Sequence, residues 1–256
     1  MDDLLIFKLV ATPVLLAAAT FASRRWGETI GGFLVGLPLT SGPISVFLAL
    51  EYGADFARQA AAGSLYGTIA QAAFCYAYFR FAPNGWPVAI ACATSGFFAA
   101  ALLTRASGVE YWQSFVLTLI AVGLVLWRTP NDRSKSSTIA IPWWDLPFRM
   151  VLLTFLVISV TLIAPYIGAT SSGIIASFPF IATILAIFSH RSFGPAAAQR
   201  IVRGMVTGLL GFSTFYVVLS FLLDRSGLVT AYLLATVGTF AVQAIVLIGM
   251  NRQRFR

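Results

Sequence analysis

The chain carries an internal duplication, and this feature limits its possible folds more than any other. With the second copy shifted by 141 residues, eight identical pairs align: Thr29/Thr170, Gly32/Gly173, Pro38/Pro179, Phe47/Phe188, Gly53/Gly194, Ala57/Ala198, Gly63/Gly204 and Gly67/Gly208. One further residue of shift aligns residues 93–99 with 235–241. We expect a fold with two related halves, because each copy encodes the same structural unit.

Composition places this duplicated fold in a membrane. Hydrophobic residues make up 59% of the chain and charged residues 10%, whereas a soluble domain carries about 25% charged residues. The chain therefore has too little polar surface to cover a globule in water. The net charge of +8 does not indicate a nucleic-acid partner, because no basic run is interleaved with aromatic residues, and basic residues gather in the cytoplasmic loops of membrane proteins.

Nine apolar stretches are long enough to cross a bilayer, which takes about 20 residues. They cover residues 4–22, 28–50, 55–81, 86–104, 109–127, 143–165, 169–189, 195–223 and 228–250. The polar residues 128–142 link the two copies, and the stretch at 109–127 has no counterpart. The chain thus divides into a first four-helix repeat at 1–105, an unpaired fifth helix, the linker, and a second four-helix repeat at 143–252.

Positive charge predicts how these helices point. If the N-terminus lies outside, thirteen Lys and Arg residues fall on the inner side and four on the outer side: Lys8, Arg58, Arg105 and Arg225. Basic residues favour the cytoplasmic side, so we expect an outside N-terminus, a cytoplasmic linker and a cytoplasmic C-terminus. The fold class is then an all-α integral membrane protein with nine transmembrane helices, in which helix 109–127 inverts the second repeat. Alternatively, residues 109–127 do not span, and the repeats are parallel.

Residue types that carry chemistry are scarce in the predicted spans. No Asp or Glu lies mid-span, although a buried carboxylate marks many proton relays. Cys75 and Cys92 lie in apolar stretches without metal-ligand or redox spacing. The single histidine, His190, falls near a helix end, where we expect it to be solvated. We predict no metal, no cofactor and no enzymatic activity, because no nucleophile, base or metal ligands are paired.

Proline-containing segments interrupt two predicted helices at matching places. Proline removes a backbone hydrogen bond, and paired broken helices point to the central site of a transporter. The predicted substrate site comprises Gly36, Pro38, Thr40, Ser41, Gly42 and Pro43 in helix 28–50, and Ser177, Pro179 and Thr183 in helix 169–189. The alternative is a simple proline kink in each helix. The second copy has no counterpart of Gly42 and Pro43, so we expect the helix of the first copy to be the more interrupted of the two.

Two further repeated features have structural and functional interpretations. The pairs Gly63/Gly67 and Gly204/Gly208 have the four-residue spacing that lets helix backbones touch. We expect them to pack helices within the chain or in a homodimer; lining the solute path is the alternative. Lys8 and Arg149 are the charges repeated by position. They either extend to lipid headgroups or form two basic gates that attract an anion.

These short motifs also carry a family resemblance. Its residues are Phe7, Lys8, Gly32, Pro38, Gly53, Gly63 and Gly67 in the first half, and Phe148, Arg149, Gly173, Pro179, Gly194, Gly204 and Gly208 in the second. Each half resembles the small GlpM-like inner-membrane proteins and related permease-like families. This chain departs from them as a fused duplication with an added helix. The resemblance implies a bacterial inner (cytoplasmic) membrane, but no substrate and no catalytic residue.

The features together predict a multi-pass membrane transporter surrounded by lipid. Its substrate would be a small neutral, amphipathic or anionic solute, because no charged residue lies mid-span. Two alternatives stay open. The apolar helices with polar breaks also suit a lipid translocase, and the glycine faces also suit a structural or assembly partner of an envelope complex.

Overall fold

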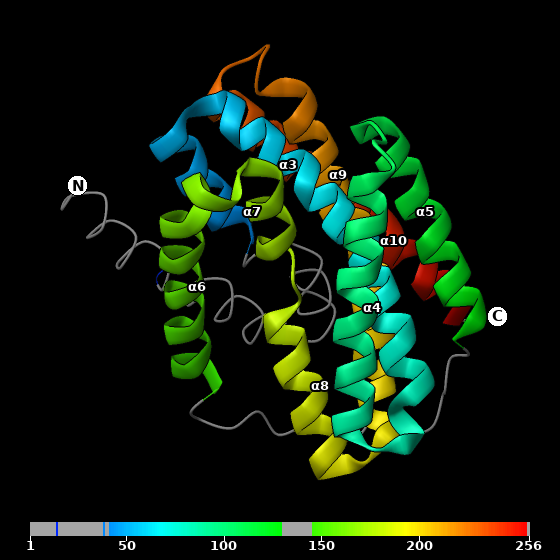
Figure 1. Ribbon diagram of the computed structural model, residues 1–256. Coiled ribbons are helices and arrows are strands. Elements are labelled where there is room, and N and C mark those ends of the chain that lie inside the picture. The colour runs from blue at the N-terminus through cyan, green and yellow to red at the C-terminus, as the bar shows by residue number, and fades with distance from the viewer. Residues whose placement is uncertain (1–13, 15–37, 39–40, 130–144, 255–256) are drawn as a thin grey trace.

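The computed structural model describes residues 14, 38, 41–129 and 145–254 (Figure 1). Every element in these residues is a helix. The helices are α3 (Ser41–Phe81), the short 3₁₀ helix η1 (Ala82–Asn84), α4 (Trp86–Ala106), α5 (Tyr111–Arg128), α6 (Asp145–Ile167), α7 (Ala169–Ala176), α8 (Phe180–Phe193), α9 (Pro195–Leu222) and α10 (Leu228–Arg254). The predictions for the stretch at 4–22, for most of 28–50 and for most of the linker lie outside the described residues.

Six helical segments of the described chain are long and apolar enough to cross a membrane: Trp86–Ala106, Tyr111–Arg128, Met150–Ile167, Ala169–Phe193, Pro195–Leu222 and Leu228–Gly249. Their outward faces expose large apolar side chains such as Leu103, Val151 and Ile245, which lipid favours and water does not. The fold is therefore that of a multi-pass helical membrane protein. The stretch predicted at 55–81 is helical within α3, but its many alanine, glycine and polar residues leave it outside these six segments.

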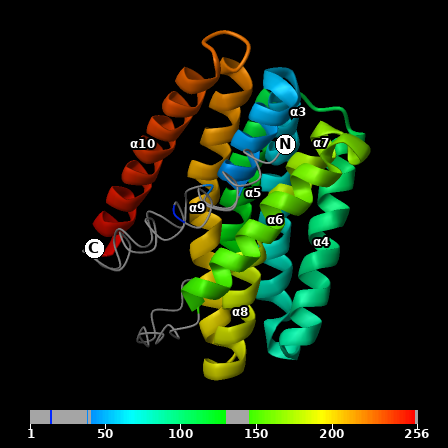
Figure 2. The same cartoon turned by 90° about the vertical axis from the view of Figure 1, so that its left-hand side faces the viewer.

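The long helices α3 and α9 form the centre of the bundle and run in opposite directions (Figure 1; Figure 2). At one end Arg58 of α3 pairs with Asp224, just beyond α9, at 2.8 Å. At the other end Gln199 of α9 donates a hydrogen bond to the Phe79 carbonyl of α3 at 2.9 Å. Since residues 57, 63 and 67 of α3 match residues 198, 204 and 208 of α9, these two corresponding helices are antiparallel.

The two copies repeat the same backbone turn. Gly53 interrupts α3 with φ 85° and ψ 173°, and Gly194 separates α8 from α9 with φ 84° and ψ 177°. Residues with a side chain rarely adopt this conformation, so both positions require glycine. The matched glycines thus perform the same local task in both halves.

Packing between neighbouring helices is repeated as well. In each copy the glycine of the A-T-x-G motif lies against two residues four apart on the preceding long helix. The contacts are Gly96 with Ala73 and Ala77, and Gly238 with Thr214 and Val218. The four partners are themselves matched at the 141-residue offset. The pair α3/α4 therefore packs as the pair α9/α10 does.

Polar contacts mark the two ends of the bundle. Arg105 donates to the Ser171 hydroxyl at 2.7 Å at the end where Gly53 lies, and at the opposite end Arg203 donates to the Leu126 carbonyl at 3.1 Å and to Thr129. The arginines whose side chains the structure describes divide between these ends as Arg58, Arg105 and Arg225 on the first, and Arg80, Arg128, Arg191, Arg200 and Arg203 on the second. The predicted topology groups these arginines in the same way; the side of the membrane on which each end lies stays a prediction.

His190 differs from its prediction. It is 8% exposed, and its Nδ1 lies 3.3 Å from the Tyr78 hydroxyl of α3. The prediction of a solvated histidine is wrong, because α8 continues to Phe193 and turns this face toward α3.

Candidate functional site at the helix breaks

The break in the second copy lies at residues 177–179, between α7 and α8. Pro179 has no N–H, and its ring disfavours helical backbone at Phe178. The Phe180 N–H therefore bonds to the Phe178 carbonyl at 2.8 Å, and α8 opens with a bond from the Thr183 N–H to the Pro179 carbonyl, also 2.8 Å. The helix predicted at 169–189 is thus two helices, the second of which extends to Phe193.

The break predicted in the first copy falls just before the start of α3. Pro38 is buried and non-helical, and α3 begins at Ser41. The Gly42 N–H donates to the Pro38 carbonyl at 2.6 Å, so this carbonyl caps the start of the helix. Ser41 and Gly42 are buried, and Pro43 is half-buried. The matched prolines thus both precede a helix start; Gly36 and Thr40 lie outside the described residues.

Ser177 connects the second break to α3. Its hydroxyl donates to the Gly173 carbonyl at 2.8 Å and lies 3.5 Å from the Ser64 carbonyl oxygen. The Ser177 carbonyl accepts a hydrogen bond from Gln71 Nε2. Because the amide nitrogen of Gln71 must face this acceptor, its Oε1 is directed elsewhere, and that oxygen has no hydrogen-bond partner in the described structure.

Tyr216 of α9 connects the first break to the same place. Its side chain is fully buried, and its hydroxyl lies within hydrogen-bonding range of the Ser41 and Ser64 side chains. Neither the Tyr216 nor the Ser41 hydroxyl forms a well-aligned hydrogen bond with a described residue, and the Ser64 hydroxyl donates to the Gly173 carbonyl at 3.2 Å. Ser41, Ser64, Gln71, Ser177 and Tyr216 are termed the polar cluster below.

The polar cluster contains three buried atoms without a described hydrogen-bond partner: Ser41 Oγ, Gln71 Oε1 and Tyr216 Oη. Leaving such an atom unpaired costs about 1–3 kcal/mol, and lipid supplies no water to replace the partner. All five side chains are uncharged, and in the described chain no three His, Cys, Asp or Glu side chains gather to hold a metal ion. The polar cluster thus offers one hydrogen-bond acceptor, Gln71 Oε1, and two hydroxyls, those of Ser41 and Tyr216, for further hydrogen bonds.

A close glycine contact positions this cluster. A Cβ added at Gly63 would lie under 3 Å from the Thr170 carbonyl oxygen, and one at Gly173 under 3 Å from the Ala60 carbonyl oxygen. The backbones of α3 and α7 therefore touch, as small residues permit. The packing role predicted for Gly63 and Gly67 is confirmed, and the partner helix belongs to the same chain.

In the second glycine pair, Gly204 does not repeat this contact. Gly204, the match of Gly63, is exposed, with nothing within 4 Å of an added Cβ. α7 covers the Gly63 face, so a homodimer could form there only if α7 moved away. The Gly204 face is exposed, and a homodimer contact through it stays a prediction.

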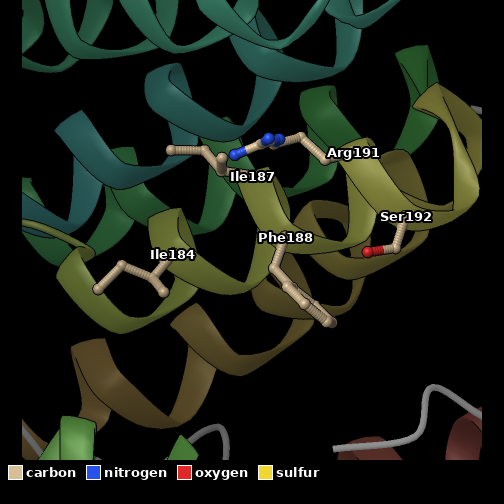
Figure 3. A pocket seen from close by; sticks show the side chains of 5 residues that line it. All are labelled: Ile184, Ile187, Phe188, Arg191 and Ser192. Carbon is tan, nitrogen blue, oxygen red and sulfur yellow. The ribbon is translucent and has the colours of Figure 1, made fainter. Parts of the chain in front are cut away.

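An open hollow of about 490 Å³ lies along α8 (Figure 3). The described residues that line it are Ile184, Ile187, Phe188, Arg191 and Ser192. It begins next to Thr183, whose buried hydroxyl oxygen has no described partner, and it continues to the end of the helix. The hollow therefore lies along α8 beyond the second break, toward the end of the bundle where Arg203 lies.

Only some of the predicted site residues lie in the polar cluster. Ser41 and Ser177 lie in the polar cluster, and Thr183 lies one turn into α8. Sequence analysis missed Ser64, Gln71 and Tyr216. Gln71 could have been found, because an amide in the middle of an apolar stretch needs a partner. Serine and tyrosine give no such signal.

The two predicted basic gates are not placed by the structure. Lys8 lies outside the described residues. Arg149 lies in α6 near its start, but its side chain is outside the described set. Both interpretations, headgroup contact and anion gate, stay predictions.

Comparison with protein-family models, with curated proteins and with solved structures found no match. The resemblance of each half to the GlpM-like proteins rests on short sequence motifs and stays a prediction. What the chain does must therefore follow from the polar cluster, the helix breaks and the hollow beside them.

Proposed function

We propose that the chain is a multi-pass transporter whose solute binds at the polar cluster, between the breaks that precede α3 and α8. The observation that carries this proposal is a set of three buried polar atoms, on Ser41, Gln71 and Tyr216, that form no well-aligned hydrogen bond with a described residue. They lie on residues that contact the start of α3 or the break between α7 and α8. A purely structural core gains stability by replacing such atoms with apolar groups. A bound solute would instead supply the missing hydrogen bonds.

The chemistry of the cluster narrows the solute class. Gln71 Oε1 accepts hydrogen bonds only, whereas the Ser41 and Tyr216 hydroxyls both donate and accept. No cluster residue carries a charge that would balance an ion in a lipid-surrounded interior. Of the neutral, amphipathic and anionic solutes predicted from sequence, a small neutral solute with at least one hydrogen-bond donor suits this site best.

The proposal includes nine spans in two inverted repeats. The antiparallel course of α3 and α9 supports it, as do the equal turns at Gly53 and Gly194. Inverted repeats around a central site allow that site to open to either side in turn. An outside N-terminus and a cytoplasmic C-terminus in a bacterial inner membrane belong to the same proposal, supported by the larger number of arginines at the Arg203 end.

Two polar contacts, termed latches below, join α3 and α9 at opposite ends. Arg58 pairs with Asp224 at 2.8 Å, and Gln199 bonds the Phe79 carbonyl at 2.9 Å. Arg58 and Gln199 are matched at the 141-residue offset, so the same position of each repeat holds the far end of the other repeat's helix. In an alternating-access cycle one latch would open while the other stays closed.

Accessibility of the cluster tests transport without knowledge of the solute. In a Cys75→Ala/Cys92→Ala background, Ser41→Cys places a near-isosteric thiol in the cluster. We expect a membrane-impermeant thiol reagent to label it from either face of sealed vesicles, because a transport site opens alternately to both. Labelling kinetics from each face are the measurement.

The matched control is Ala70→Cys, at a fully buried position of α3, which should not be labelled from either face. If Ser41→Cys is as unreactive as Ala70→Cys, the cluster is a closed core, and an assembly partner becomes the better description. A labelled-lipid translocation assay on the same vesicles distinguishes a lipid translocase, the candidate that the hollow along α8 favours.

The latches predict opposite effects of two substitutions. Arg58→Gln should raise the labelling rate of Ser41→Cys severalfold from the Gly53 face, and Gln199→Ala should raise it from the other face. Arg58→Gln should change global stability little, because an exposed ion pair contributes about 0–1 kcal/mol, and the side chains of Arg58 and Asp224 are 38% and 47% exposed. Equal increases from both faces in either variant would show general loosening instead of a latch.

A further inference from the structure

We propose that the hollow along α8 binds one anionic phospholipid of the surrounding membrane. Its described lining residues, Ile184, Ile187, Phe188, Arg191 and Ser192, follow one another at steps of three, one, three and one. This spacing places them on a single stripe of the helix. The stripe is a continuous groove wall about two turns long.

The chemistry of the stripe changes along its length. Ile184, Ile187 and Phe188 are apolar, whereas Arg191 and Ser192 are polar and exposed. The polar pair lies at the end of the membrane-length segment Ala169–Phe193, and the apolar residues lie nearer its middle. An amphiphile seated here would place its chain at hydrocarbon depth and its headgroup at the interface, the order that a phospholipid has in a bilayer.

Arg191 supplies the charge that selects the headgroup. It forms no salt bridge with a carboxylate of a described residue; its contact is a cation–π interaction with the Trp86 ring, 5.9 Å from the ring centroid. Figure 3 shows its side chain extending back along α8 toward Ile187. Guanidinium donors pair well with phosphate oxygens, and tryptophan beside a basic residue is typical of the membrane interface.

Two other described arginines at this end do not line the hollow. Arg203 is engaged by the Leu126 carbonyl and Thr129, and Arg128 stacks on Trp127 at 4.9 Å. A volume of about 490 Å³ is within the range of about 300–1,000 Å³ typical of ligand sites. The lipid site is separate from the polar cluster, so it does not depend on transport.

Lipid binding by the purified full-length chain in detergent tests the proposal. Native mass spectrometry with added phosphatidylglycerol or phosphatidylcholine should show one tightly held anionic lipid. Arg191→Gln should weaken phosphatidylglycerol binding about fivefold, the effect of removing one basic residue near a headgroup. Arg191→Lys should keep the preference for the anionic lipid, because it keeps the charge.

The matched control is Arg128→Gln, which removes an arginine stacked on a tryptophan at the same end but away from the hollow. Ile187→Trp, which fills the apolar part, should weaken binding of the tight lipid whatever its headgroup. Equal losses in Arg191→Gln and Arg128→Gln would overturn the site in favour of diffuse surface charge. If inorganic phosphate alone displaced the bound lipid, the site would recognise the phosphate group without the acyl chain, and the phospholipid site would be overturned. Unchanged thermal unfolding without lipid verifies that each variant is folded.

Discussion

Gly173→Leu is expected to separate α7 from α3 and to lower the free energy of unfolding by about 3 kcal/mol or more, the upper range for overpacking. A Cβ at Gly173 would meet the Ala60 carbonyl oxygen and the Ser64 backbone nitrogen. These are backbone atoms of a long helix and cannot rotate away, so relief requires α7 to move. The Ser64 and Ser177 hydrogen bonds at the contact would be lost with it.

The buried thiol of Cys75 provides the measurement. This side chain is 1% exposed, so a thiol-reactive fluorophore reports unfolding during a thermal ramp in detergent. Because Cys92 is partly exposed, the assay uses a Cys92→Ala background. Gly173→Leu should lower the midpoint strongly, and Gly63→Leu should do the same, because its added side chain would meet the Thr170 backbone.

The duplication provides the control for this experiment. Gly204→Leu alters the residue matched to Gly63, yet nothing lies within 4 Å of a Cβ there. Its midpoint should stay the same or rise, because leucine favours helix over glycine by about 0.8–1 kcal/mol. Equal destabilisation by Gly63→Leu and Gly204→Leu would contradict the α3–α7 contact.

The positions of the helices could be predicted from the sequence because each is fixed locally. The stretches predicted at 86–104 and 195–223 correspond to α4 and α9 within two residues at each boundary. Apolar length sets the span, and glycine or proline sets the turn. Gly85 precedes α4 with Pro87 in its first turn, and Pro195 opens α9. Such signals lie within a few residues of the boundary that they define.

The composition of the candidate site could be predicted only in part, because it depends on contacts between distant segments. Pro38 and Pro179 indicated where α3 and α8 begin, and Ser41 and Ser177 were identified with them. Gln71 and Tyr216 join these residues only because α7 approaches α3 at backbone distance and α9 runs antiparallel to α3. His190 was misjudged for the same reason: its burial depends on Tyr78, 112 residues away.

Tyr216→Phe should weaken solute transport through the polar cluster about tenfold without destabilising the fold. The Tyr216 hydroxyl is buried and lacks a well-aligned partner, so its removal should leave the free energy of unfolding unchanged or raise it by about 1 kcal/mol. If the hydroxyl binds the solute, uptake into proteoliposomes should fall about tenfold, the effect of losing one hydrogen bond of about 1.4 kcal/mol. The assays are the Cys75 thermal ramp and uptake of a panel of labelled polyols and amides.

Tyr232→Phe makes the identical chemical change with the opposite expectation. The Tyr232 hydroxyl is bonded to Ser45 Oγ at 2.7 Å, so its removal leaves a buried hydroxyl unpaired and should cost about 1 kcal/mol or more, while uptake stays unchanged. The contrast between the two tyrosines isolates the cause, since ring packing is kept in both. If Tyr216→Phe destabilises the protein as Tyr232→Phe does and leaves uptake intact, the polar cluster is a structural hydrogen-bond network, and solute binding must be sought elsewhere.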